Sequence, residues 1–251
     1  MPIDQSVSNS AAGPDRAPSL VGDEPGVPRY LVRRYWWAYL HPAGISFFDH
    51  PWVVNLILWG NMARLRRAAF DALGPEPLSG RTVQLACVYG DLTPRLADRH
   101  EAGAALEVID VLPQQLAKLE RKIGHQGHVA LRRCNSAALG GADGRYDQAL
   151  IFFLLHEQPE RVRRATLREA TRVVRPGGRV VIVDYHLPHR LNPLRYLMRP
   201  VLGWLEPYAL DLWRRDLSAW LPEREVATVQ RRLFFGGLYQ MLVLTVCPDS
   251  A

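Results

Sequence analysis

One stretch of the chain decides its fold class: Thr82-Val83-Gln84-Leu85-Ala86-Cys87-Val88-Tyr89-Gly90-Asp91-Leu92-Thr93. Its first half is apolar and predicts a strand, and Gly90-Asp91 predicts a turn that opens a helix. A second apolar strand ends on Asp110, about 20 residues past that turn. Doubly wound nucleotide-binding folds place a carboxylate at this distance, where it binds the hydroxyls of a ribose. Asp110 is therefore the strongest single prediction of a binding residue, with the N-cap of the following helix as its alternative role.

From Arg81 onward strands and helices alternate, which is the pattern of a mostly parallel sheet covered on both faces. We expect strands at 82–87, 105–110, 129–134, 146–153 and 179–185, and helices at 92–101, 113–123 and 160–174. Gly236-Gly237 separates two further strands, 226–235 and 238–247, and predicts an antiparallel hairpin. The proline-rich segment 187–220 interrupts the alternation and predicts broken helices inserted before that hairpin.

The chain divides into three parts. Residues 1–28 are rich in Ser, Ala, Pro, Gly and Asp, lack the apolar stretch of a secretory signal, and are expected to be disordered. Residues 29–74 form an aromatic-rich helical segment, expected to act as a lid or to face a membrane. Residues 78–251 form the core domain, in which the insertion 187–220 either covers a substrate pocket or packs on the sheet edge.

The formal charge of +6 comes almost wholly from arginine, because Lys118 and Lys122 are the only lysines. This excess either favours anionic membrane surfaces or nucleic acid, or reflects codon bias. The three cysteines form no CxxC pair, so neither a zinc site nor a disulfide framework is indicated, and a reducing, cytosolic compartment fits. The apolar run from Trp52 to Trp59 is shorter than the roughly 18 residues that span a bilayer, but it suits a membrane interface.

Polar residues follow the ends of the expected strands, where such folds bind ligands. The third strand leads into Asn135 and Ser136, and Asn135 either accepts a hydrogen bond from a ligand or forms a turn. The fourth strand leads into His156-Glu157, which could act as a base, orient a substrate or bind a metal. The alternatives are that His156 packs against a cofactor and that Glu157 caps the next helix. The fifth strand ends with Asp184-Tyr185-His186, so that His156, Asp184 and His186 could together supply metal ligands.

An unusual aromatic cluster precedes the core domain: Tyr35-Trp36-Trp37-Ala38-Tyr39-Leu40-His41-Pro42. Aromatic side chains of this size are typical of a protein core. They also line flat apolar pockets that suit a quinone ring, and they gather at lipid–water interfaces. The sequence leaves these three roles open.

The run from Arg168 to Asp184, with Pro176-Gly177-Gly178 between its helix and its strand, resembles class I methyltransferases, especially the quinone and sterol types. The resemblance implies a Rossmann-like methyltransferase fold that binds S-adenosylmethionine (SAM). Such enzymes usually carry Asp-x-Gly-x-Gly-x-Gly where this chain has Gln84, Ala86, Val88 and Gly90. Gln84 removes a negative charge, and Val88 is expected to resist unusual backbone angles because it is β-branched. Either SAM binding is lost, or, as we expect from the intact surroundings, it is retained.

The aromatic cluster 35–42, the altered Val88-Tyr89-Gly90-Asp91 loop and Pro176-Gly177-Gly178 together resemble the rhodoquinone biosynthesis protein family (RquA-type). The resemblance covers nearly everything from Tyr30 to Cys247. It implies conversion of ubiquinone to rhodoquinone, in which an amino group replaces a ring methoxy group. SAM is then implied as the amino donor and manganese as a supporting divalent ion. A polyprenyl substrate implies a cytoplasmic protein that is peripherally attached to the inner membrane.

On this basis we expect three sets of site residues. The cofactor-binding residues are expected to be Ala86, Val88, Tyr89, Gly90, Asp110, Val111, Asn135, Ser136 and Phe153. Tyr35, Trp36, Tyr39 and His41 are expected to bind the substrate, and Tyr89, His156 and His186 to handle protons. The alternatives are a conventional SAM-dependent methyltransferase acting on a quinone or another lipid, and a non-catalytic scaffold in quinone biosynthesis. A nucleic-acid partner is not indicated, because no basic, aromatic-interleaved stripe accompanies the core.

Overall fold

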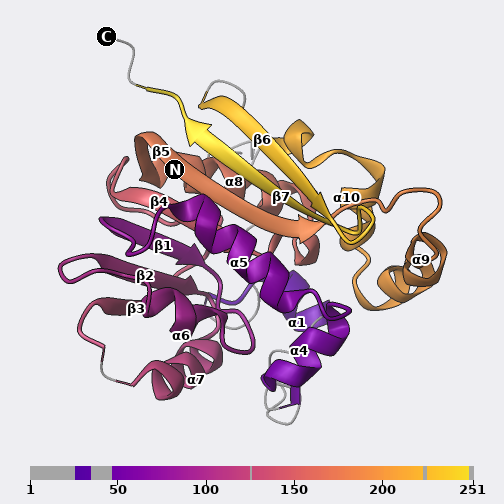
Figure 1. Cartoon of the computed structure of the whole chain (residues 1–251), viewed down its shortest axis with the longest axis horizontal. Coiled ribbons are helices and arrows are strands. Elements are labelled where there is room, and N and C mark those ends of the chain that lie inside the picture. Colours follow the sequence, from indigo (N-terminus) through magenta and orange to yellow (C-terminus); the bar gives the residue numbers. More distant parts are fainter. Residues whose placement is uncertain (1–25, 35–46, 125, 223–224, 249–251) are drawn as a thin grey trace, which may run out of the picture.

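The computed structural model describes residues 26–34, 47–124, 126–222 and 225–248. Their centre is a seven-stranded sheet in the order β3-β2-β1-β4-β5-β7-β6 (Figure 1). The first five strands pair in parallel, whereas β7 runs antiparallel to β5 and to β6. The strands are β1 (Arg81–Leu85), β2 (Ala105–Asp110), β3 (Val129–Arg133), β4 (Tyr146–Phe152), β5 (Val174–Tyr185), β6 (Val226–Phe234) and β7 (Tyr239–Val246).

Helices cover both faces of this sheet. Figure 1 shows α5 in front of the strands and α8 behind them. The α-helices are α1 (Arg29–Arg34), α4 (Pro51–Ile57), α5 (Met62–Leu73), α6 (Leu92–Ala97), α7 (Pro113–Ile123), α8 (Glu160–Val173), α9 (Leu194–Leu205) and α10 (Ala209–Arg214). The central strands are buried almost end to end, as parallel strands covered on both faces must be.

The expected strands and helices are present with small changes at their ends. The helix expected over 92–101 ends at Ala97, because the chain beyond it pairs with the segment before β1. The Leu78 N–H donates to the Arg99 carbonyl at 2.7 Å, and the Glu101 N–H donates to the Leu78 carbonyl at 3.0 Å. After a turn at residues 98 and 99, these bonds hold the chain alongside Leu78 where the helix would have continued.

Strand β5 begins at Val174, five residues before the expected start at 179. Val174 pairs with Tyr146, and the register shifts before the regular pairing from Gln148 onward. A Cβ atom on Gly178 would lie 2.6 Å from the Asp147 carbonyl oxygen, so the close approach of the two strands requires glycine there. The Pro-Gly-Gly run is thus a bulged part of the strand itself.

The segment between β5 and β6 contains helices, as the sequence predicts. It holds α9, α10 and a short 3-10 turn, Leu217–Trp220. Helix α10 packs on another 3-10 turn, Leu155–Glu157, which closely follows β4. The insertion therefore reaches the carboxyl end of the sheet. Within the described residues, no helix is both long and apolar enough to cross a membrane.

Candidate functional site

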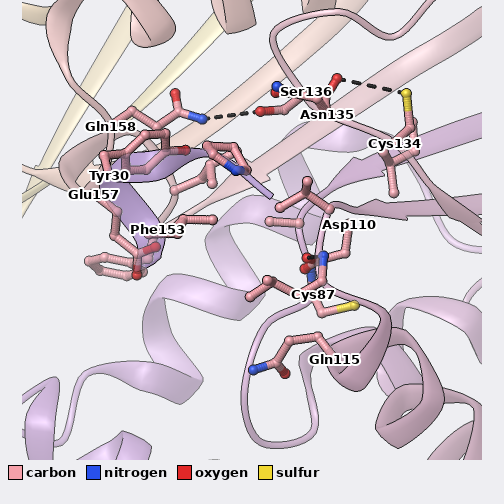
Figure 2. Close-up of a pocket in the computed structure, with 17 residues that line it drawn as sticks. Tyr30, Cys87, Asp110, Gln115, Cys134, Asn135, Ser136, Phe153, Glu157 and Gln158 are labelled. Atoms are coloured by element: carbon pink, nitrogen blue, oxygen red, sulfur yellow. Dashed lines mark hydrogen bonds between the residues drawn. The ribbon is translucent and has the colours of Figure 1, made fainter. Parts of the chain in front are cut away.

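Two adjoining pockets lie at the carboxyl ends of β1, β2 and β4. The first, drawn in Figure 2, is mainly polar on one side and is closed by residues of α1. Its lining residues are Pro28, Tyr30, Leu31, Ala86, Cys87, Ile109, Asp110, Val111, Leu112, Gln115, Cys134, Asn135, Ser136, Phe153, Leu154, Glu157 and Gln158. The second is mainly apolar, and its lining residues are Phe48, Val54, Ile57, Leu58, Cys87, Val88, Tyr89, Phe152, Phe153, His156, Glu157, Tyr185 and Glu206. Cys87, Phe153 and Glu157 belong to both. The two pockets are therefore neighbours that share part of their walls.

Asp110 is fixed in the first pocket by backbone bonds. Its Oδ2 accepts from the Cys87 N–H at 2.8 Å, and its Oδ1 accepts from the Leu112 N–H at 2.8 Å. Burial raises the pKa of Asp110, and these backbone bonds oppose that rise. The expected alternative role is not observed, because the N-cap of α7 is Leu112. Figure 2 shows Asp110 and Cys87 on one side of the pocket, opposite Tyr30 and Glu157.

The altered loop after β1 keeps the backbone shape of a glycine turn without its first glycines. Ala86 has a φ of 73°, in the left-handed region that an alanine rarely adopts. The strain expected at Val88 is not present, since Val88 is absent from the left-handed residues of the described chain. Val88 instead lines the second pocket. The substitution therefore changes the shape of a pocket rather than the path of the backbone.

Gln84 holds this loop in place. It is fully buried, and its Nε2 donates to the Ala86 carbonyl and to Thr93 Oγ1, both at 2.9 Å. A carboxylate at this position could not donate to the Ala86 carbonyl and would place a charge beside that oxygen. The neutral amide is therefore part of the altered loop, linking it to the first turn of α6.

The variant Gln84→Glu is expected to lower the free energy of unfolding by about 2–4 kcal/mol, because the bond to the Ala86 carbonyl is lost and a charge is buried. Chemical denaturation measures this change. Thr93→Val is the matched control: it removes one of the two partners and leaves the bond to Ala86, so a smaller loss is expected. A Gln84→Glu variant as stable as the unmodified protein would contradict this role.

Tyr89 lines the second pocket and contacts helix α7. Its hydroxyl accepts a hydrogen bond from Gln115 Nε2 at 2.7 Å, and Lys118 Nζ lies 5.9 Å from its ring centroid. Burial raises the pKa of Tyr89, so its hydroxyl keeps its proton near neutral pH. Tyr89 therefore contributes its ring to the pocket lining and its hydroxyl to a hydrogen bond.

His156, which lines the second pocket, lies among three carboxylates. Its Nδ1 donates to Asp184 Oδ1 at 3.0 Å, while its Nε2 lies 3.6 Å from Glu206 Oε2 and 3.7 Å from Glu157 Oε1. Asp184 is fully buried and also accepts from the Leu155, His156 and Tyr185 N–H groups. Burial alone would lower the pKa of His156, but the three carboxylates outweigh it and raise the pKa to about 10. His156 therefore carries a proton at neutral pH.

Glu206, which follows α9, completes this cluster. Its Oε2 is buried and has no hydrogen-bond partner among the described residues. Burial raises the pKa of Glu206, and the charge of His156 opposes the rise. The only acidic residue in the stretch 187–210 is thus held against His156. A single acidic residue in an otherwise apolar stretch is a recognisable sequence signal, and it could have identified Glu206 as a candidate site residue.

The charge on His156 makes stability depend on pH in the alkaline range. The pKa in the folded protein, about 10, is above the unfolded value of roughly 6.5, so this contribution is complete below about pH 6.5. It is lost as the pH rises through about 10. Thermal unfolding from about pH 6 to 10.5 is expected to show a steeper alkaline loss of stability for the unmodified protein than for His156→Asn. Parallel curves would contradict the raised pKa.

The structure brings together most of the predicted site residues. Ala86, Asp110, Val111, Asn135, Ser136 and Phe153 line the first pocket, and Val88, Tyr89, Phe153 and His156 line the second. Asn135 also has the turn-forming role weighed as its alternative, since its Oδ1 accepts from the Ala137 N–H at 2.9 Å. Glu157 lines both pockets, and the N-cap of α8 is Pro159, so the predicted capping role of Glu157 is not observed.

Two predicted residues lie elsewhere. The Gly90 N–H donates to Asp49 Oδ1 at 3.2 Å, and its carbonyl accepts from Lys122, so it braces the loop beside the pockets. His186 bonds to the Gly237 carbonyl through Nδ1 at 2.8 Å and lines neither pocket as the described residues form them. Its predicted part in proton transfer has no geometric support. The substrate residues Tyr35, Trp36, Tyr39 and His41 lie outside the described residues.

The proposed ligand set His156, Asp184 and His186 is not formed. Asp184 bonds to His156 Nδ1, whereas His186 turns to the backbone of the β6–β7 hairpin. Across residues 26–34, 47–124, 126–222 and 225–248, no group of three or more His, Cys, Asp or Glu side chains is arranged to hold a metal. The side chains around His156 form an ion-pair cluster, so manganese remains an expectation from the sequence.

Comparison with known proteins supports the same fold. The sequence pattern of a family described as "Methyltransferase domain" matches residues 83–178. A demethylmenaquinone methyltransferase of Bacillus licheniformis is 26% identical over 181 residues, covering 64% of this chain and 77% of that protein. One of Thermus thermophilus is 33% identical over 135 residues, covering 53% and 60% respectively. The structure of phosphoethanolamine N-methyltransferase 2 of Haemonchus contortus, in complex with S-adenosyl-L-methionine, aligns with a TM-score of 0.63 at 10% identity, covering 89% of this chain and 62% of that one.

The chain therefore has the class I, Rossmann-like methyltransferase fold, with a mostly parallel sheet and an antiparallel C-terminal hairpin. This confirms the fold class predicted from the sequence. The residues that match the family pattern, 83–178, include β2, β3 and β4 and most of β1.

Proposed function

We propose that this protein is a SAM-dependent transferase that modifies the ring of a lipid quinone. One observation carries the proposal: a pocket built around Asp110 and a more apolar pocket built around His156 share Cys87, Phe153 and Glu157. Such an arrangement would place a cofactor and an acceptor next to each other, as group transfer requires. The similarity to demethylmenaquinone methyltransferases supports a quinone as the acceptor.

The residues of the first pocket fit SAM. The Asp110 carboxylate at the end of β2 suits the two ribose hydroxyls. Gln158 Oε1 is buried in the same pocket, and no described residue bonds to it. It could accept a hydrogen bond from an adenine amine. The residues around both groups are thus suited to an adenosine, and when bound SAM would supply the group that is transferred.

The second pocket fits a quinone ring. Phe153 and Tyr185 both line the pocket beside His156, and they pack edge to face with their ring centroids 5.5 Å apart. The protonated His156 would donate to a quinone carbonyl and draw electrons from the ring. Glu157, which lines both pockets, is placed to accept a proton that the donor group releases.

The group transferred is the finer part of the proposal, and we infer that it is the amino group of SAM. A positively charged donor at the carbonyl would activate an oxidised quinone toward an amine nucleophile, which would add to the ring carbon that bears the methoxy group and expel it as methanol. The bond between this nitrogen and the α-carbon of the donor would then have to break: loss of the α-proton would pass two electrons to the quinone, and water would hydrolyse the resulting imine, leaving the amino group on the reduced ring. Methyl transfer would instead need a reduced, deprotonated ring, and His156 already holds its proton. The resemblance of the altered loop to rhodoquinone biosynthesis proteins supports the same choice.

Methyl transfer to a quinone-related acceptor is the second candidate. The names of the relatives support it more directly than they support amination. Both reactions use the same two pockets and differ in the product formed from SAM. Incubation with SAM and each of two acceptors, a short-chain ubiquinone and a reduced short-chain quinone with one unsubstituted ring carbon, tests the shared proposal: a ring-modified quinone must form from one of them, and only when SAM is present. An unchanged quinone, despite SAM raising the thermal midpoint, would contradict it.

A further inference from the structure

Two helices beside the second pocket carry large apolar side chains in solvent. On α9, Leu194, Met198 and Leu202 face the protein, and the opposite side is also apolar. Leu191 is 81% exposed and Trp204 is 82% exposed, which is unusual for side chains of this size. We call the following residues the apolar face: Trp52, Leu56, Ile57 and Trp59 from α4 and its end, and Leu191, Tyr196, Leu197, Val201 and Trp204 from α9 and the residues before it.

Within the two stretches that carry the apolar face, every Asp, Glu, Lys or Arg residue is an arginine. The stretches 51–70 and 187–205 contain no Asp or Glu, while Arg190 and Arg199 are exposed among the apolar residues of α9. Tryptophan and tyrosine prefer the boundary between lipid and water, and arginine attracts anionic lipid headgroups. A protein partner would not require aromatic residues and arginines to occur together in this way. The chemistry is complementary to the surface of an anionic bilayer.

The apolar face adjoins the second pocket on two sides. Val54, Ile57 and Leu58 of the α4 region line that pocket, and Ile57 is also 42% exposed, so it lies at the rim. On the other side, Glu206 lines the pocket directly after the end of α9. Figure 1 shows α4 at the lower edge of the molecule and α9 at its right-hand edge. The second pocket is therefore lined both from the α4 region and from the residue that follows α9.

We propose that the apolar face is a docking surface for an anionic lipid bilayer and presents the second pocket to the membrane. Both helices would lie in the interface, α9 with its exposed side and α4 with its tryptophans. The sequence predicted such attachment for the run Trp52–Trp59 alone, and the structure adds α9. The inference rests on the proposed function in one respect: the ring of a membrane-held quinone would enter the pocket without leaving the bilayer.

Vesicle flotation tests this surface, with full-length protein and vesicles of phosphatidylcholine and phosphatidylglycerol at about three to one. The variant Leu191→Ser/Leu197→Ser/Trp204→Ser is expected to bind at least about tenfold more weakly than the unmodified protein. Arg190→Gln/Arg199→Gln is expected to lose binding severalfold on these vesicles. Val229→Ser/Leu233→Ser is the matched control, because it removes exposed apolar side chains from the distant strand β6 and is expected to bind normally.

Failure of the unmodified protein to float would overturn the proposal, as would equal losses in the triple variant and the β6 control. A dimer in solution that the triple variant dissociates, without vesicle binding, would assign the face to a second copy of the chain. SAM-induced thermal stabilisation must be the same in all variants. A protein that floats but never modifies a short-chain quinone would leave the docking surface standing and contradict the proposed function.

Discussion

Replacing Asp110 with Ala is expected to weaken SAM binding by about 100-fold or more. Its carboxylate would make charge-assisted bonds to two ribose hydroxyls, each worth about 1.5–3 kcal/mol, and about 1.4 kcal/mol corresponds to a factor of ten. Isothermal titration with SAM measures the loss. Thermal shift provides a second measurement, since a ligand that binds the folded state stabilises it in a way that depends on its concentration and affinity.

The matched control for Asp110 lies on the same strand. Glu107 is buried and bonds to Arg132, Arg145 and the Tyr146 hydroxyl, away from both pockets. Glu107→Gln is expected to reduce stability while leaving SAM affinity within about threefold, because it removes ion pairs without touching the cofactor. If Asp110→Ala binds SAM as well as Glu107→Gln does, the first pocket is not the SAM site.

Replacing His156 with Asn is expected to lower turnover of a short-chain quinone by about 10²- to 10⁴-fold, the usual contribution of a placed proton donor. The Asn amide can still donate to Asp184, so the fold around the 3-10 turn should survive. SAM affinity is expected to remain within about threefold, because His156 lies in the second pocket. Steady-state kinetics with titration of SAM separates the two quantities.

His186→Asn is the control for this loss of turnover. His186 has the same side chain and follows Asp184 by two residues, but its Nδ1 bonds to the Gly237 carbonyl rather than to a pocket group. It is expected to retain near-normal turnover. Equal losses in the two variants would contradict the assignment of proton donation to His156.

Much of the fold can be predicted from the local pattern of apolar, proline and glycine residues in the sequence. Strand β2 and helix α7 begin and end where the sequence predicts, because an apolar run ending on Asp110 and a proline at the helix start are clear boundary signals. Helix α6 is shorter than predicted because the residues after it pair with Leu78, which is remote in sequence. Such long-range pairing leaves no local pattern to read.

The site was predictable where it depends on strand ends and not where it depends on packing. Asp110 and His156 follow directly from their positions after buried strands. Glu206 comes from the insertion, Tyr30 from α1 and Phe48 from the segment before α4, so their places depend on how those segments pack. The orientation of the His186 side chain could not be predicted either, because it depends on a hydrogen bond to the Gly237 carbonyl in the β6–β7 hairpin.

The altered loop has a left-handed residue that is not glycine. Ala86 has a φ of 73°, and its carbonyl accepts a hydrogen bond from the buried Gln84 side chain. Ala86 lines the first pocket and Val88 lines the second. Under the proposed function, these two positions would border the cofactor and the acceptor respectively.

Mass spectrometry with SAM carrying nitrogen-15 at its α-amino group tests the proposed reaction most directly. The purified protein would be incubated with this SAM, a short-chain ubiquinone and manganese. We expect an aminated quinone that contains the label and has lost its methoxy group, without stoichiometric S-adenosylhomocysteine. A parallel reaction would contain a reduced quinone with one unsubstituted ring carbon. An unlabelled, methylated product and S-adenosylhomocysteine from that acceptor, with ubiquinone unchanged, would contradict amination and establish methyl transfer, and no product from either acceptor would contradict both.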